Sequence, residues 1–248
     1  MSLDTVITAP ADLGPRERAA MLRLMDAHFD GLEPATFRRD LEAKDWVILL
    51  RDGPEIGGFS TVQVLHAVFR GRSQRLLFSG DTIVAPEHRN RPALAGCFGH
   101  LILHELERCG AEPLHWLLIS KGYRTYRFLP MNFKAFFPRF GQDTPEEIQA
   151  LLDQVAQDQF GARFDRAAGL VRAAPGTDRL KPVLCAIPQG RAEDPHVRFF
   201  LERNPGFAAG DELVCLTPLT RDNLTAMGWR QIQRASPAWM LSPEAPGR

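Results

Sequence analysis

The stretch 76–106, which reads LLFSGDTIVAPEHRNRPALAGCFGHLILHEL, constrains the fold more than any other part of the chain. It reads as a β-strand, a tight basic turn and a long helix whose apolar residues recur at helical spacing. The start of such a helix can hold an anion, because its first backbone N–H groups have no internal partner and the helix dipole favours negative charge there. The turn carries Arg89 and Arg91 with Asn90 between them, so we expect an α/β protein with an anion site at this turn. The alternative is that Pro92 simply begins the helix and that both arginines are solvated.

The rest of the first 140 residues alternates between strand and helix patterns. The apolar run at 46–50 predicts a strand that is buried on both faces. Strand, helix and strand between 75 and 120 imply a right-handed crossover and a parallel pair of strands. The aromatic segment 123–137 contains Pro130, so any helix there is short or kinked. In chain order we expect strands at 5–8, 46–50, 56–69, 75–85 and 114–120, and helices that begin at Pro15, at Pro34 and after the basic turn.

The pattern changes beyond Gly141. Thr144 and Asp194 are each followed by proline, which predicts two helix starts. We expect further strands at 182–187, 212–216 and 229–233, and a proline-rich tail from Ser236. The sequence therefore predicts an α/β fold in which residues 1–140 form a core with a mixed central sheet flanked by helices. Residues 141–248 form an additional C-terminal α/β region, either separate or completing the same fold.

The composition narrows the class of protein. Thirty Lys and Arg residues balance thirty Asp and Glu residues, and this net charge of zero argues against a dedicated nucleic-acid binder. The four cysteines are far apart and form no CxxC pair, which is typical of a reducing compartment rather than of a zinc ribbon or a disulfide framework. The sequence shows neither a signal-peptide pattern nor an apolar run long enough to cross a bilayer. We expect a cytoplasmic protein that binds neither nucleic acid nor a membrane.

The end of the central strand and the turn after it carry a pattern, Val84-Ala85-Pro86 followed by Arg89-Asn90-Arg91-Pro92-Ala93-Leu94. Together with the element order from residue 5 to residue 137, this pattern resembles the GNAT superfamily of CoA-dependent N-acyltransferases. In that family the strand ends in hydrophobic-x-Pro, and the backbone amides of an Arg/Gln-x-x-Gly-x-Gly/Ala turn cradle the CoA pyrophosphate. The resemblance implies a GNAT-like mixed sheet and acetyl-CoA or another acyl-CoA as donor. It also implies a donor site that comprises Ile83, Val84 and the six residues Arg89, Asn90, Arg91, Pro92, Ala93 and Leu94.

Two positions of the turn depart from the family pattern. Pro92 stands where Gly is expected, and Leu94 stands where Gly or Ala is expected. Proline has no N–H, so one phosphate donor is lost, and a leucine side chain obstructs a backbone approach that glycine allows. Arg89 and Arg91 can replace the lost attraction with charge-assisted hydrogen bonds. Otherwise the chain has changed its acyl donor or lost donor binding.

The resemblance also implies the chemical groups that the reaction needs. An amine that attacks a thioester carbonyl needs a base, an oxyanion-type donor from the strand backbone and often an acid that protonates the thiolate. The acid is frequently a tyrosine on the helix after the crossover strand, and Tyr126 lies there. The alternative for Tyr126 is a packed ring with a hydrogen-bonded hydroxyl at the rim of the core.

Three polar residues on strands are candidates for the base or for substrate binding. Strict alternation places Asp81 on one face with Leu77 and Ile83, where apolar neighbours raise a carboxyl pKa toward that of a base. The alternative is a structural aspartate at a bend in the strand. His66, on a mostly apolar strand face, is a base candidate because its ordinary pKa is near neutral, or else a core histidine with satisfied hydrogen bonds. Ser120 ends the crossover strand, where ligands gather in open α/β sheets.

Two further clusters have simpler explanations. His100 and His104 are four residues apart on one helix, but they lack the HExxH pattern and fall opposite its apolar face, so we expect a solvated face and no metal. Lys121, Arg124 and Arg127 form a basic cluster that could receive CoA phosphates or an acidic carrier protein, or that is solvated surface.

The leading hypothesis is an N-acyltransferase that moves an acetyl or longer acyl group from a CoA thioester to an amine of a small molecule or a protein. One alternative is an acyl carrier protein as donor, and another is a non-catalytic binding module on a degenerate GNAT scaffold. The acceptor amine and the acyl length stay open at this point, and assembly as a homodimer is compatible with the sequence.

Overall fold

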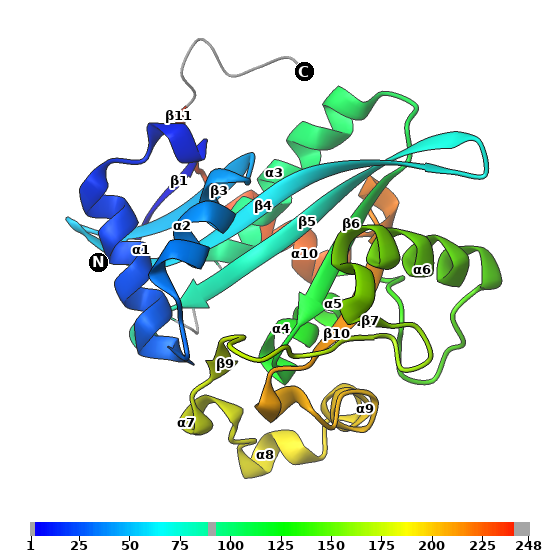
Figure 1. The fold of residues 1–248 in the computed structure, drawn as a ribbon. Helices are drawn as coiled ribbons and strands as arrows, with labels where there is room; N and C mark the ends of the chain where they lie inside the picture. The colour runs from blue at the N-terminus through cyan, green and yellow to red at the C-terminus, as the bar shows by residue number, and fades with distance from the viewer. Residues whose placement is uncertain (1–2, 89–92, 241–248) are drawn as a thin grey trace.

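A large mixed sheet forms the centre of the molecule (Figure 1). The computed structural model describes residues 3–88 and 93–240, and within them the sheet has nine strands in the order β11-β1-β3-β4-β5-β6-β10-β8-β7. These strands are β1 (Asp4–Thr8), β3 (Trp46–Asp52), β4 (Glu55–Phe69), β5 (Arg72–Val84), β6 (Leu114–Ser120), β7 (Phe164–Asp165), β8 (Leu170–Val171), β10 (Glu212–Pro218) and β11 (Ala238–Met240). A separate two-stranded ribbon pairs β2 (Phe29–Asp30) with β9 (Arg179–Leu180).

The central strands follow the predicted order. The neighbours β1, β3, β4 and β5 pair antiparallel, and a turn with Arg70 and Gly71 at positive φ closes the β4–β5 hairpin. Helix α3 (Ala93–Cys109) then crosses over to β6, which runs parallel to β5 as expected for a crossover connection. The α/β class and the mixed sheet flanked by helices are therefore confirmed.

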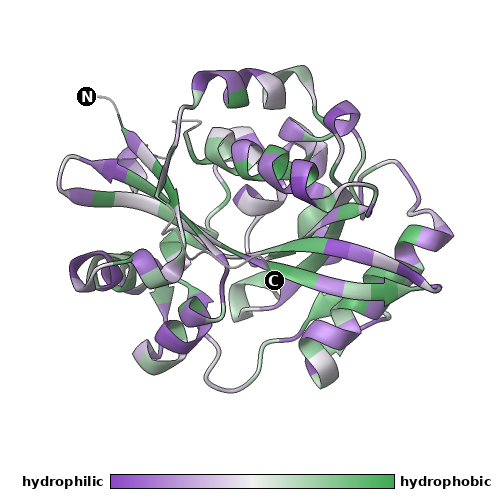
Figure 2. Ribbon diagram, turned by 90° about the horizontal axis from the view of Figure 1, so that it is seen from above, coloured by the Kyte–Doolittle hydropathy of each residue, from purple (hydrophilic) through white to green (hydrophobic). Residues whose placement is uncertain are grey.

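Helices cover both faces of the sheet, as the view from above shows (Figure 2). One face packs against α3, α9 (Pro195–Arg203) and α10 (Ala226–Arg234), and also against two short helices, α4 (Tyr123–Tyr126) and α5 (Phe128–Asn132). The other face packs against α1 (Pro15–His28) at one end and α6 (Glu146–Phe160) at the other, with α2 (Pro34–Glu42) beside α1. Alternating side chains on each strand therefore enter different cores.

Segments beyond residue 140 join the same sheet. β10 pairs antiparallel with β6 on one side and with β8 on the other. β11 pairs parallel with β1 at the opposite edge, so part of the predicted tail is a strand. The predicted strand at 182–187 is wrong, because Pro182 begins the short helix α7 (Pro182–Cys185), which is followed by α8 (Gln189–Ala192).

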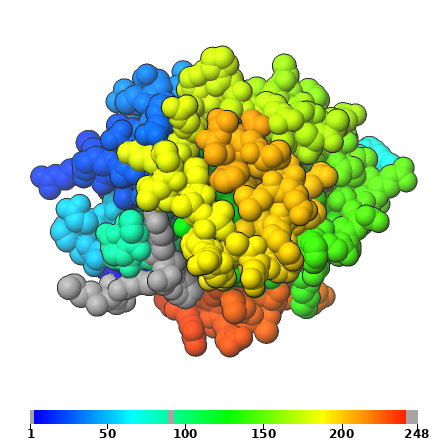
Figure 3. Space-filling view, turned by 90° about the horizontal axis from the view of Figure 1, so that it is seen from below, coloured from blue at the N-terminus to red at the C-terminus, as the bar shows by residue number. Residues whose placement is uncertain are grey.

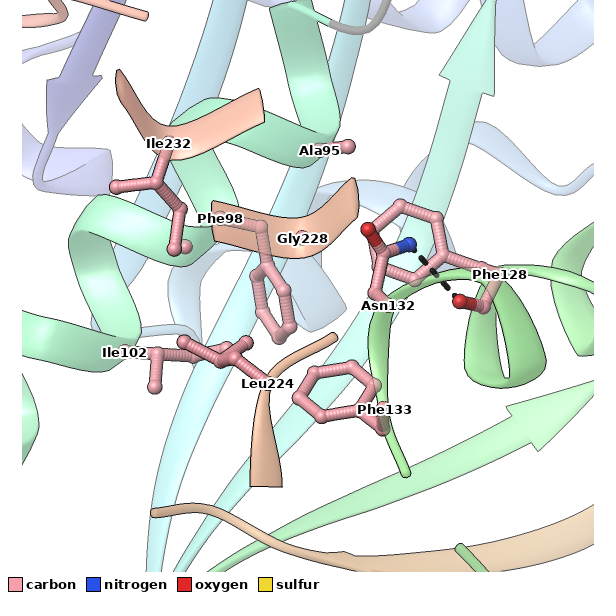
Figure 4. A pocket seen from close by; sticks show the side chains of 10 residues that line it. Ala95, Phe98, Ile102, Phe128, Asn132, Phe133, Leu224, Gly228 and Ile232 are labelled. Atoms are coloured by element: carbon pink, nitrogen blue, oxygen red, sulfur yellow. Dashed lines mark hydrogen bonds between the residues drawn. The ribbon is translucent and has the colours of Figure 1, made fainter. Parts of the chain in front are cut away.

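The predicted strand at 229–233 is also wrong, because this segment lies in helix α10. The Thr225 hydroxyl caps that helix by accepting a hydrogen bond from the Gly228 N–H. α10 packs so closely on α3 that a Cβ at Gly99 would lie 2.3 Å from Ile232, and one at Gly96 would lie 2.5 Å from the Gln231 carbonyl oxygen. Figure 4 shows the small pocket left between these two helices, with Phe98, Phe133 and Ile232 around it.

The polar face predicted for α3 is covered rather than solvated. His100 Nε2 lies 3.0 Å from the carbonyl oxygens of Ile232 and Ala235, at and beyond the end of α10. The ring of His104 packs on Trp46 and Trp239, the latter from β11. Both histidines therefore attach C-terminal segments to the core. Among the helices described, none combines the length and the apolar character needed to cross a bilayer.

Candidate active site

The sheet opens where β5 parts from β6. The two strands pair from Arg75 with Leu114 to Ser79 with Leu118, and β5 then continues to Val84 without further pairing to β6. β5 has a bulge at the same point. Ser60 of β4 pairs with Thr82, and Val62 pairs with Ser79. Bulges re-aim side chains and are frequent next to active sites, so this divergence is the candidate site.

The bulge corrects the face predicted for Asp81. Two residues of β5, Gly80 and Asp81, stand opposite one residue of β4, which interrupts the alternation of side chains. As a result Leu77 lies in the core against α3, whereas Ile83 lies in the core against α1 and α2. The electrostatic neighbours of Asp81 include Asp40 of α2, so its side chain shares the second face and not the first.

Gly80 allows two polar groups to approach the bulge. A Cβ at this position would lie 2.6 Å from Thr61 Oγ1 and 3.3 Å from Lys44 Nζ. Thr61 Oγ1 is buried and has no hydrogen-bond partner among the described residues. Lys44 Nζ is also buried, 2.9 Å from Asp40 Oδ1 and 5.3 Å from the centre of the Phe78 ring. A hydroxyl and an ammonium group therefore converge beside Asp81.

The surroundings of Asp81 favour its neutral form. Its side chain is half-buried, and burial together with the charges of Asp40 and Asp178 raises its pKa from 3.8 to about 7. The charges of Lys121 and Lys44 act in the opposite direction. A carboxyl group with a pKa near neutrality can take up and release a proton at physiological pH, which is the property of a general base.

Lys121 follows β6 directly and lies between carboxylates. Its Nζ is 2.9 Å from both oxygens of Asp178, 3.9 Å from Glu212 Oε1 and 5.3 Å from the centre of the Phe29 ring. Burial alone would lower the pKa of Lys121, but the charges of Glu212 and Asp178 outweigh it and raise that pKa. For the carboxyl group of Glu212, burial raises the pKa, and the charge of Lys121 opposes this shift. The site therefore holds an ion-pair network with more carboxylates than ammonium groups.

The C-terminal region covers this side of the site. Asp178 precedes β9, which pairs with β2 at the end of α1, and the Lys181 N–H donates to the His28 carbonyl oxygen over 3.0 Å. Figure 3, the view from below, shows this yellow part of the chain against the blue N-terminal helices. Asp178 and Glu212 thus reach the Asp81 cluster from segments more than 90 residues further along the chain.

The basic cluster predicted beside β6 holds this covering region in place. Arg124 donates to the Leu184 carbonyl oxygen over 2.9 Å, and Arg127 pairs with Asp194 at 2.9 Å. Together with the bond from Lys121 to Asp178, all three side chains point into the protein's own C-terminal region. They are therefore anchors of that region.

Tyr126 and Ser120 have structural partners. The Tyr126 ring is fully buried among Phe136, Phe199 and Phe200, its hydroxyl donates to the Pro138 carbonyl oxygen over 3.0 Å, and burial raises its pKa. The Ser120 hydroxyl is buried as well and donates to the Gly122 carbonyl oxygen over 2.9 Å. The structure does not bring either hydroxyl into the electrostatic surroundings of Asp81.

His66 lies away from the bulge. It is exposed on β4 and stands opposite Arg75, toward the hairpin turn that joins β4 and β5. The bulge lies between Ser60 and Val62, further from that turn along the same strand. The structure therefore separates His66 from Asp81. His66 shares its strand face with Val64 and Val68 as predicted, but it is not a core histidine, because β4 extends beyond the core here and Val68 is exposed as well.

The structure describes only some of the residues predicted to bind the donor. Arg89, Asn90, Arg91 and Pro92 lie outside the described residues, so the phosphate-binding turn stays a prediction. The side chain of Ile83 is buried. The Ala85 N–H donates to the Gly57 carbonyl oxygen of β4. Because successive backbone N–H groups of a strand point in opposite directions, that of Val84 points away from β4 and toward the side of β6. α3 begins at Ala93, and Leu94 is buried in the core, so its side chain does not stand in the opening.

The sequence patterns missed Lys44, Thr61, Asp178 and Glu212 as members of this site. Each comes from a different segment, and no local spacing connects them to Asp81. The one local signal is Gly80 in a strand, since glycine there often marks a bulge. Among the described residues, no group of three or more His, Cys, Asp or Glu side chains could hold a metal ion.

Comparisons with known proteins give similarity to solved structures only, since no protein-family model and no curated protein sequence matches this chain. A probable N-acyltransferase from Enterococcus faecalis superposes with a TM-score of 0.43 at 14% identity, over 55% of this chain and 33% of that one. A GCN5-related N-acetyltransferase from Kribbella flavida gives 0.40 at 17% identity, over 54% and 34%. A GNAT-family N-acetyltransferase from Escherichia coli in complex with CoA gives 0.35 at 13% identity, over 52% and 69%. The match thus spans about a third of the length of the first two structures.

Proposed function

We propose that this protein is an N-acyltransferase that moves an acyl group from a CoA thioester to an amine of a small molecule or a protein. The observation that carries the proposal is the coincidence of three features at one point of β5: the bulge at Gly80-Asp81, the divergence from β6 and a carboxyl group with a pKa of about 7. The resemblance of the strand, turn and helix at 76–106 to the GNAT pattern implies the same chemistry for this part of the chain.

The opening beside β5 suits an extended donor. β5 continues beyond Ser79 after its pairing with β6 has ended, and an amide-containing chain such as pantetheine could add to the sheet at this point. The predicted phosphate-binding turn follows this strand directly in the sequence. A thioester bound along this edge would have its carbonyl near the bulge, beside Asp81.

Asp81 is the proposed base. Acyl transfer forms a C–N bond between the amine and the thioester carbonyl and breaks the C–S bond, and the attacking amine must lose a proton. The ionised carboxylate of Asp81 accepts that proton, and the departing thiolate of CoA takes up a proton from solvent. Because burial and the charges of Asp40 and Asp178 raise the pKa of Asp81, its carboxylate is a stronger base than an ordinary aspartate.

Donor binding is the first test. We would titrate acetyl-CoA, a long-chain acyl-CoA and free CoA into the protein by calorimetry, and repeat each titration with Arg89→Ala and with the exposed control Arg23→Ala on α1. Micromolar binding that only Arg89→Ala weakens supports the proposal. A preference for the long chain would favour donors of that kind, including carrier-bound acyl groups. If none of the three binds, the CoA-dependent function is wrong.

A further inference from the structure

A cleft of about 350 Å³ opens at the edge of β10, between α6 and α9. Its volume lies within the range of small-molecule pockets, roughly 300–1,000 Å³. None of its lining residues belongs to the Asp81 cluster. The lining comes from the 138–144 loop, both helices, the β7–β8 turn and β10: Pro138, Arg139, Gln142, Asp143, Thr144, Gln149, Leu152, Gly169, Phe199, Arg203 and Val214.

The cleft exists because the neighbours of β10 are short. β8 pairs only with Glu212 and Leu213, and the Val214 N–H then donates to the Gly169 carbonyl oxygen over 3.0 Å. Two residues further along, Leu216 forms an isolated bridge with Phe137. Between these two attachments no described strand continues along this edge. Val214 therefore lies at the bottom of a gap that α6 and α9 flank.

Two arginines give the cleft its charge. Among the described residues, neither Arg139 nor Arg203 forms an ion pair with a carboxylate. One amino group of Arg139 donates to the Lys134 carbonyl oxygen, and one of Arg203 reaches the Ala168 carbonyl oxygen at 3.5 Å. A guanidinium group has five N–H donors, so each arginine keeps donors for a ligand.

Both arginines line the same cleft. Burial raises the pKa of the Tyr126 hydroxyl, and the charges of Arg139 and Arg203 both oppose that rise. That hydroxyl donates to the carbonyl oxygen of Pro138, which lines the cleft. Asp143 is the one carboxylate among the described lining residues, and it is exposed at the rim of the cleft. The cleft therefore carries a net positive charge.

We propose that this cleft binds a small organic carboxylate with a short apolar body, at a site separate from the proposed acyl-transfer site. Arg139 and Arg203 bind the carboxylate, since guanidinium groups match its planar geometry. Leu152, Phe199 and Val214 contact the apolar body. Gln142, Thr144 and Gln149 are neutral polar residues that can donate to the same ligand.

Benzoate is the probe for this site, and benzamide is its matched neutral control. We would titrate each by calorimetry into the full-length protein in the presence of saturating CoA, which keeps the predicted donor site filled. The variants are Arg203→Gln and Arg139→Gln, and the control is Arg198→Gln, an exposed arginine on α9 that does not line the cleft. We expect saturable benzoate binding, weakened about tenfold or more by either variant and unchanged by the control, since a charge-assisted hydrogen bond of about 1.5–3 kcal/mol is lost.

Three results would overturn the site. The first is no saturable benzoate binding up to ~10 mM, a concentration tenfold above a weak Kd of ~1 mM. The second is equal binding of benzamide and benzoate, and the third is equal benzoate binding by Arg203→Gln and the wild type. Arg203 is exposed, so its substitution leaves the fold intact even if Arg139→Gln, which loses the bond to Lys134, does not fold.

Discussion

Strand β5 carries a buried charge cluster near each end, and the two clusters differ in whether every charged group has an opposite partner in contact. Near its start, Arg75 Nη1 lies 3.0 Å from Glu105 and its Nε lies 3.5 Å from Glu112, while the Trp46 indole donates to Glu105 over 3.2 Å. Every charge there has an opposite partner in contact, and Glu105 is 2% exposed. Such a network attaches α3 to the sheet.

In the cluster near the end of β5, Asp81 forms no ion pair within the part of the chain that the structure describes. Asp81 faces two lysines, but each lysine is already in contact with another carboxylate: Lys44 with Asp40 and Lys121 with Asp178. Burial, and after it the charges of Asp40 and Asp178, raise the pKa of Asp81, so a proton can come and go there. The comparison indicates that burial combined with the lack of an ion pair at Asp81 among the described residues separates the reactive cluster from the structural one.

The largest expected effect follows from removing the charge of Asp81. We expect Asp81→Asn to lower kcat/KM for amine acylation by about 10²–10³-fold, because a general base typically contributes rate factors of this order. The measurement is release of CoA thiol in a steady-state assay with an amine panel. Asp26→Asn, an exposed aspartate on α1, is the control and should retain full activity. Full activity of Asp81→Asn would remove Asp81 from the mechanism.

A substitution in the cluster around Arg75 should lower the stability of the protein rather than its activity. Glu105→Ala leaves Arg75 buried without its closest partner and Trp46 without an acceptor, so we expect a loss of about 3 kcal/mol in the free energy of unfolding. Urea unfolding at pH 7 measures this loss. Glu107→Ala, two residues away in an exposed pair with Arg221, should cost less than about 1 kcal/mol. Similar costs for both variants would contradict the distinction between the clusters.

The raised pKa of Asp81 also predicts a pH dependence of stability. Between pH 3.8 and about 7 the folded protein holds a proton on Asp81 that the unfolded chain releases, so this group makes the folded state less stable as pH rises through that window. Asp81→Asn lacks the effect, so we expect it to be more stable than the wild type by at least about 1 kcal/mol at pH 8, with a difference that vanishes toward pH 3. Melting curves of both proteins at pH 4, 6 and 8 test this, and a constant difference at all three values would disprove the raised pKa.

Sequence patterns predicted the strands and helix that carry this site better than they predicted the residues that form it. Alternation and helix-start signals were sufficient for β3 to β6 and α3, since each of these elements has a strong local pattern. Asp81 was found for the same reason, as a carboxylate in an apolar strand. Its neighbours could not be found, because Lys44, Asp178 and Glu212 reach it only through tertiary contacts.

Short amphipathic segments explain the wrong strand predictions. Residues 229–233 are too few to distinguish helical from strand periodicity, and the segment is a helix because the glycine face of α3 accepts it closely. Gly80 indicated a bulge in the sequence. Which face of the sheet Asp81 occupies, however, depends on the register between β5 and β4, and the pattern of a single strand does not determine that register. Long-range register and close packing are therefore the parts that sequence patterns do not determine.

Substitution of Asp40 has the smallest expected effect, and it tests directly whether a neighbouring carboxylate raises the pKa of Asp81. Asp40 pairs with Lys44 and raises the pKa of Asp81 by its charge. Asp40→Asn removes that charge and leaves Lys44 with an excess positive charge beside Asp81, so both changes favour the carboxylate of Asp81. We expect the acidic limb of the kcat/KM profile to lie near pH 7 in the wild type, as the pKa of Asp81 predicts, and to move down by about one unit in Asp40→Asn. An unmoved limb with normal activity would show that the charge of Asp40 does not contribute to the pKa of Asp81 and has no role in the chemistry.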